Sequence, residues 1–171
     1  MESKILFIEG PEGVGKTPAA EAISKILGYK HLRYDFPDIA YTSDAWLGVL
    51  IASVSMYESG IRLVIERSLH GWEFHNSFGR CNPCKYLSPE FKDCFYGSLS
   101  RWDRAAVLAL TTSENNLREN LAKKNDSSKI VVCHDYYAGM EVFCNILSYD
   151  VKSYCSNWID EIVEKVRYSG F

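Results

Sequence analysis

The sequence contains no apolar run that approaches the roughly 18 residues needed to cross a bilayer. The charged and then apolar pattern of a signal peptide is also missing before the first apolar segment. From these two absences we expect a cytoplasmic protein that has no membrane partner. No internal repeat or low-complexity linker divides the 171 residues, and 47% of them are hydrophobic. The composition therefore predicts a single globular domain over residues 1–171.

Positive charge is not in excess either. The formal net charge at pH 7 is −3, which disfavours a broad nucleic-acid-binding surface. A local basic groove would leave this count almost unchanged, so a nucleic-acid partner is disfavoured but stays open. The composition also leaves open whether the protein forms a homodimer.

Six cysteines are more than an intracellular protein needs. Cys81 and Cys84 flank a turn-forming Asn-Pro pair, and Cys94 follows them, so a zinc site completed by His75 is one reading of this group. The second C-x-x-C pair that usually accompanies such a knuckle is missing. We therefore favour reduced, unliganded thiols over zinc.

One stretch carries a specific motif. Gly10 to Thr17 fit the pattern G-x-x-x-x-G-K-[ST] without a mismatch. The apolar run 5–8 before it predicts a buried parallel strand, and residues 19–27 predict a helix that Gly28 closes. This order of strand, glycine-rich loop and helix is the context in which the motif binds phosphate.

The residue types of this loop have a physical reason. Glycines allow backbone turns that residues with a Cβ avoid, so successive N–H groups can point at phosphate oxygens. We expect Lys16 to reach the β- and γ-phosphates of a nucleoside triphosphate and the Thr17 hydroxyl to hold Mg²⁺. The residues expected to bind the nucleotide cofactor are Gly10, Glu12, Gly13, Val14, Gly15, Lys16 and Thr17.

Strand and helix patterns alternate along the rest of the chain. Further strands are predicted at 31–34, 62–68, 105–110 and 149–154, and further helices at 45–59, 115–124, 135–147 and from Trp158 onward, with 130–132 as an alternative short strand. Such alternation predicts an α/β fold in which a five-stranded parallel sheet carries helices on both faces. Residues 70–104, rich in aromatic residues and cysteine, form an irregular insertion in this scheme, and residues 113–130 a lid.

At this point the chain resembles a known group of proteins, the P-loop nucleoside and nucleotide kinases. Residues 7–17 look like the opening of bacterial-type thymidylate kinases, and residues 33–38, with Phe36-Pro37, are similar to their acceptor-side loop. Glu66-Arg67-Ser68 instead matches the Glu-Arg-Ser motif of deoxynucleoside kinases. The resemblance implies a single-domain P-loop kinase fold and a small-molecule nucleoside or nucleotide as acceptor. It also implies ATP as the donor.

Phosphoryl transfer requires charge neutralisation and positioning, which suggests roles for the remaining polar residues. Arg67 follows a strand and could grip donor and acceptor phosphates together. We expect Glu66 to bind Mg²⁺ through water or to orient Arg67. Asp35 is the candidate general base if the acceptor is a hydroxyl. Lys16, Asp35, Glu66 and Arg67 are thus the predicted catalytic residues.

Substrate contacts are predicted from aromatic and basic residues. Phe36 and Trp72 are the candidates to stack on the acceptor base, with Arg67 on its phosphate. From the lid, Arg118 is the candidate to reach the donor phosphates, and solvated helix charge is its competing interpretation.

The leading hypothesis is transfer of the γ-phosphate of ATP to a thymidylate-like deoxynucleoside monophosphate. A deoxynucleoside kinase, or a phage-type kinase that acts on a modified base or on DNA, is the alternative. From another class, the chain could be a nucleotide-binding regulatory NTPase. That reading is disfavoured because the sequence shows no glutamine or Asp-x-x-Gly pattern after a strand that could position an attacking water. Adenine rather than guanine as the donor base is implied by the resemblance, since no Asn-Lys-x-Asp guanine motif is present.

Overall fold

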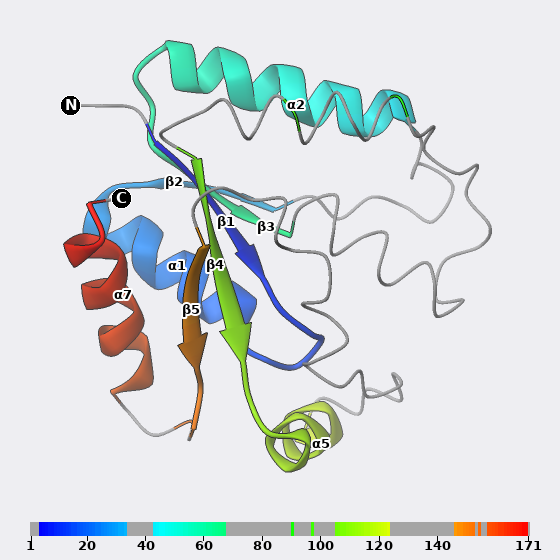
Figure 1. The fold of residues 1–171 in the computed structure, drawn as a ribbon, viewed down its shortest axis with the longest axis vertical. Coiled ribbons are helices and arrows are strands. Elements are labelled where there is room, and N and C mark those ends of the chain that lie inside the picture. Colours follow the sequence, from blue (N-terminus) through cyan, green and yellow to red (C-terminus); the bar gives the residue numbers. More distant parts are fainter. Residues whose placement is uncertain are drawn as a thin grey trace.

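The computed structural model describes residues 4–33, 43–67, 105–123, 146–152, 154 and 157–170, together with 90 and 97. These residues form one sheet and the helices around it (Figure 1). The strands are β1 (Ile5–Glu9), β2 (Lys30–Arg33), β3 (Leu63–Glu66), β4 (Ala105–Thr111) and β5 (Ile146–Asp150). The helices are α1 (Lys16–Leu27), α2 (Ser43–Glu58), α5 (Glu114–Lys123) and α7 (Trp158–Tyr168).

All strand pairings in this sheet are parallel, and the strand order is β2-β3-β1-β4-β5. The first strand of the chain therefore lies at the centre, flanked by β3 and β4. This arrangement confirms the predicted α/β fold with a five-stranded parallel sheet. In such sheets the carboxyl ends of the strands share one edge, and ligands bind in the crevice beyond it.

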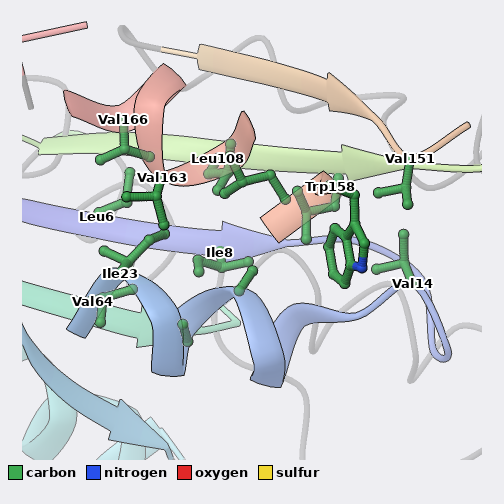
Figure 2. Packing of buried hydrophobic residues seen from close by; sticks show 14 of the residues in the cluster. Leu6, Ile8, Val14, Ile23, Val64, Leu108, Val151, Trp158, Val163 and Val166 are labelled. Atoms are coloured by element: carbon green, nitrogen blue, oxygen red, sulfur yellow. The ribbon is translucent and has the colours of Figure 1, made fainter. Parts of the chain in front are cut away.

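The core lies between the sheet and the helices on either side of it. Helices α1 and α7 lie side by side against one face, and α2 lies on the other side of the sheet (Figure 1). The three inner strands β1, β3 and β4 are buried on both faces, which explains why their sequences are nearly continuous apolar runs, whereas the edge strands β2 and β5 are partly exposed. Figure 2 shows the cluster beneath α1 and α7, which includes Leu6, Ile8, Ile23, Val64, Leu108, Trp158, Val163 and Val166.

Several element ends follow from local chemistry as predicted. Gly28 ends α1 in the left-handed region at φ 73°, and its N–H donates to Ser24 O at 3.1 Å. Helix α7 begins at Trp158, as predicted, and Asn157 is its N-cap; the Asn157 side-chain amide donates to Glu161 Oε1 at 2.9 Å instead of accepting from the helix backbone. The position of this helix start was therefore predictable, and its hydrogen bond was not.

The structure corrects the predicted bounds of the last strand. The sequence predicts a helix through residue 147 and a strand at 149–154, whereas β5 begins at Ile146 and ends at Asp150. The reason is pairing: Ile146 aligns with Val107 and Asp150 with Thr111, so β5 ends level with β4. A short apolar run beside a helix pattern fits both secondary structures, and only the neighbouring strand selects one.

Other predictions fall outside the described residues. These are the irregular insertion at 70–104 apart from residues 90 and 97, the alternative strand at 130–132, the helix over 135–145 and the part of the lid beyond residue 123. Within the described part of the chain, no helix has the length and apolar character required of a membrane span.

The turn between β1 and α1 packs tightly against side chains from α5 and α7. A Cβ built on Gly15 would lie 2.6 Å from the Trp158 ring, and one on Gly13 would lie 3.2 Å from Leu121 Cγ. Both glycines have positive φ, 99° and 84°. Glycine is therefore required here for two reasons, the backbone conformation and the close approach of a neighbour.

We predict that Gly15→Ala lowers the free energy of unfolding by about 1–3 kcal/mol, because the new methyl meets a rigid ring and the backbone is strained. Gly48→Ala is the matched control. Gly48 lies in α2, and a Cβ added there would meet nothing within 4 Å, so that variant should gain about 0.5–1 kcal/mol. Urea unfolding measures both, and equal stability of the two variants would contradict the packing described.

Candidate active site

The site is assembled at the carboxyl edge of the two central strands. Ile8 of β1 aligns with Glu66 of β3, and the N–H of Arg67 donates to Ile8 O at 2.9 Å. The glycine-rich loop that follows β1 and the charged residues that end β3 are therefore neighbours. This pairing places the loop beside the acid-arginine pair Glu66-Arg67 at the end of β3.

The loop has the backbone geometry of an anion-binding turn. Gly10, Gly13 and Gly15 all have positive φ, at 153°, 84° and 99°. Gly15 is also the N-cap of α1, so the positive end of that helix begins where the loop ends. Backbone amides and a helix N-terminus together favour a bound anion such as phosphate.

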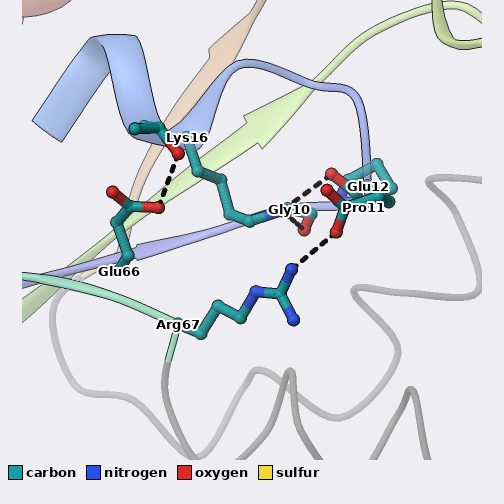
Figure 3. Close-up of polar contacts among 7 residues, drawn as sticks. Gly10, Pro11, Glu12, Lys16, Glu66 and Arg67 are labelled. Carbon is teal, nitrogen blue, oxygen red and sulfur yellow. Dashed lines mark hydrogen bonds and ion pairs between the residues drawn. The ribbon is translucent and has the colours of Figure 1, made fainter. Parts of the chain in front are cut away.

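Lys16 extends along the loop and is buried, with 6% of its surface exposed. Its Nζ donates to the carbonyl oxygens of Gly10 at 2.8 Å and Pro11 at 2.9 Å (Figure 3). Burial, followed by the nearby charge of Arg67, lowers the pKa of Lys16 to about 8. The ammonium group of Lys16 is thus hydrogen-bonded to the backbone of the glycine-rich loop.

Three carboxylates lie near Lys16. Glu12, Glu9 and Glu66 each favour the charged form of Lys16, although burial outweighs them. Glu9, the last residue of β1, is completely buried. A buried carboxylate next to a buried ammonium marks a site where charge is concentrated away from water. In the sequence Glu9 reads as the end of an apolar strand, so no local pattern identifies it as a site residue.

Thr17 and Glu66 form the oxygen pair expected at a magnesium site. Thr17 Oγ1 donates to Glu66 Oε2 at 2.8 Å, and His31 Nε2 is hydrogen-bonded to Glu66 Oε1 at 2.7 Å. A hydroxyl and a carboxylate are ligand types that Mg²⁺ accepts, directly or through water. The donor set therefore fits the ion. His31 orients the carboxylate from β2, a contact that the sequence pattern did not reveal.

Arg67 is aimed into the site by an unusual backbone. Its φ is 68°, and among the described residues it is the only residue other than glycine with a positive φ. Its Nη2 contacts Glu12 Oε2 at 2.6 Å (Figure 3). This contact joins Arg67 to the loop, a partner that the sequence does not suggest; Glu66 as the residue that orients Arg67 stays a prediction. Strained backbone of this kind is concentrated at functional sites.

Helix α5, the first part of the predicted lid, is docked on the loop. Leu121 packs beside Gly13, and Asn120 Nδ2 donates to Gly13 O at 3.0 Å. Arg118 pairs with Glu114 one turn earlier and has 61% of its side chain exposed. The structure does not bring Arg118 to the loop.

The remaining predicted site residues lie outside the described part of the chain. They are the acceptor-side residues Asp35, Phe36 and Trp72, and the candidate zinc ligands His75, Cys81, Cys84 and Cys94. Within the residues that are described, no group of three or more His, Cys, Asp or Glu could hold a metal ion.

No protein-family model matches this chain, and a search of the curated proteins found no match either. Solved structures do match. The YorR protein of Bacillus subtilis, in complex with phosphorylated GDP, has a TM-score of 0.73 at 14% identity; the match covers 98% of this chain and 95% of that chain.

Two further matches have lower TM-scores but cover similar shares of both chains. A deoxyadenosine kinase from M. mycoides with bound dATP has a TM-score of 0.56 at 15% identity, over 95% of this chain and 99% of that one. A gluconokinase from Sinorhizobium meliloti has a TM-score of 0.55 at 18% identity, over 98% and 93%. These likenesses span nearly the whole of each chain, and the protein accordingly has a P-loop kinase fold.

Proposed function

We propose that the protein is a phosphotransferase that moves the γ-phosphate of ATP to a deoxynucleotide, a thymidylate-like deoxynucleoside monophosphate. The observation that carries this proposal is the convergence of the glycine-rich loop, Lys16 and Arg67 on the carboxyl edge of β1 and β3. Two cations beside a glycine-rich loop and a helix N-terminus suit the transfer of a phosphoryl group, because its oxygens share negative charge in the transition state.

Each described residue has a distinct task in this proposal. The loop amides and the start of α1 hold the donor phosphates, and Lys16 neutralises the transferring group after leaving the Gly10 and Pro11 carbonyls. Arg67 holds donor and acceptor oxygens together, since its guanidinium offers donors along two edges. Its pairing with Glu12 keeps it directed at the loop until a phosphate competes for it.

Magnesium fits the pair formed by Thr17 and Glu66. When bound to a nucleoside triphosphate, this ion neutralises charge on the β- and γ-phosphates. The chain's own contribution is to fix the two oxygens: α1 positions the hydroxyl, β3 positions the carboxylate, and His31 fixes the second carboxylate oxygen. Such second contacts commonly determine how well a ligand set is oriented.

A deoxynucleoside is the second candidate acceptor. The Glu66-Arg67-Ser68 sequence favours it, and the deoxyadenosine kinase among the structural matches supports it. Asp35 would then take the proton that the acceptor hydroxyl loses, whereas a monophosphate acceptor requires no general base. The proposal of Phe36 and Trp72 as base-stacking residues applies to either acceptor.

We predict that ATP turnover depends on an added acceptor and is largest with dTMP or dUMP. The measurement is a coupled ADP-release assay with a panel of deoxynucleoside monophosphates, deoxynucleosides, gluconate and single-stranded DNA. A preference for thymidine would favour the nucleoside kinase. ADP release at the same rate with every acceptor and with none would contradict the kinase proposal and favour a regulatory NTPase.

We predict that Arg67→Ala lowers acceptor-dependent turnover by about 10²–10³-fold, because a charged donor to the transferring group is removed. Arg167→Ala is the matched control: Arg167 also pairs with a glutamate, Glu164, but lies on the exposed side of α7. That variant should remain within about twofold of wild type, as surface ion pairs contribute little. Similar losses in both variants would count against a role for Arg67.

We predict that triphosphate binding takes up a proton on Lys16. In the free protein its pKa is about 8, and nearby phosphate charge raises that pKa, so binding near about pH 9 should be accompanied by proton uptake and should weaken as the pH rises further. Calorimetry in buffers of different ionisation enthalpy measures the number of protons.

The matched control for this experiment is Lys25→Met, which removes an exposed lysine from the same helix. It should retain the proton uptake, whereas Lys16→Met should lose it and bind more weakly. Equal uptake in Lys16→Met and wild type would show that another group binds the proton.

A further inference from the structure

Two side chains from distant parts of the chain, Tyr154 and Asn120, are hydrogen-bonded to the backbone of the glycine-rich loop. The Tyr154 hydroxyl donates to Val14 O at 3.1 Å and approaches Gly13 O at 3.5 Å. Asn120 Nδ2 donates to Gly13 O at 3.0 Å. Both contacts end on carbonyl oxygens of the loop, so they act on the orientation of its peptide planes.

The direction of these carbonyls determines where the amides point. A trans peptide is planar, with its C=O and N–H on opposite sides. Because Tyr154 holds the Val14 carbonyl on the outer side, the N–H of Gly15 in the same peptide must face the opposite side. The N–H of Val14, one peptide earlier, donates to Pro11 O at 3.3 Å and closes the turn. Asn120 thus stabilises the turn, and Tyr154 directs the amide at the start of α1.

The two side chains are themselves fixed. The Tyr154 ring meets the Trp158 ring edge to face, with centroids 5.3 Å apart, and Trp158 contacts Gly15. One turn before Asn120, Asn116 Nδ2 donates to Thr112 Oγ1 at 2.9 Å, and it also reaches the carbonyl oxygens of Val151 and Lys152. The segments that carry Tyr154 and Asn120 are therefore joined to each other as well as to the loop.

We propose that Tyr154 and Asn120 are positioning residues for phosphate binding, which hold the loop peptides in the orientation that presents the Gly15 amide to an anion. This inference rests on the proposed function, since it assigns these residues to the same phosphate site. Without the two hydrogen bonds, glycine peptides would rotate among several orientations, and the apparent affinity would fall with the fraction of correctly oriented loop.

The test uses the full chain and inorganic tripolyphosphate as the probe, with binding measured by calorimetry and stability by thermal unfolding. Tyr154→Phe removes the hydroxyl and keeps the ring beside Trp158. Asn120→Asp keeps the shape and loses the donor. Tyr154→Phe should bind tripolyphosphate about 3–10-fold more weakly, the effect of one hydrogen bond. Asn120→Asp should lose at least as much affinity, because it loses a hydrogen bond and also places a negative charge beside the loop. Both variants should have an unfolding midpoint close to that of the wild type.

Matched controls make the same chemical changes elsewhere. Tyr168→Phe alters a tyrosine of α7 that is 82% exposed, and Asn115→Asp adds the same charge to α5 at an exposed position; both should bind as the wild type does. Wild-type affinity in Tyr154→Phe and Asn120→Asp would overturn the inference, as would losses that only follow a lower unfolding midpoint. A wild type that does not bind tripolyphosphate would overturn the proposed function as well.

Discussion

The parallel pairing of β1 with β3 is the constraint on which the candidate site depends. Because Ile8 and Glu66 are in register, the chain leaves both strands at the same height. The loop after β1 then folds back beside the residues that end β3, and Thr17 meets Glu66 while Glu12 meets Arg67. A shift of one residue in this register would move Glu66 to the opposite face of the sheet and separate it from Thr17.

Burial gives this cluster its chemical character. Charges that leave water must be paired, and here Lys16 has partners in the loop, while Glu66 has partners in α1 and β2. Lys16 is held by two carbonyl oxygens and is near three carboxylates, yet burial still lowers its pKa to about 8. The site therefore holds cations whose charged state is stabilised further by an anion. That is a suitable starting condition for binding a triphosphate.

The conformation of the glycine-rich loop depends on its own glycines and on side chains from later parts of the chain. The glycines permit the turn, but Leu121 and Trp158 fill the space next to Gly13 and Gly15, while Asn120 and Tyr154 hold the carbonyls. Helix α5, which the sequence places within a lid, thus contacts the loop through Leu121 and Asn120. The part of that lid beyond residue 123 stays a prediction. A loop held in its binding conformation needs less reorganisation when phosphate binds.

The sequence by itself determined the features that local rules control. The motif from Gly10 to Thr17, the apolar strands and the glycine at the end of α1 each depend on a few neighbouring residues, and each was predictable. The alternation of strands and helices then determined a parallel sheet. What only the tertiary structure decided are contacts between residues far apart in the chain. Side-chain partners depend on strand order and register, which no short pattern encodes: His31 with Glu66, Arg67 with Glu12, Tyr154 with Val14, and the bounds of β5 are all of this kind.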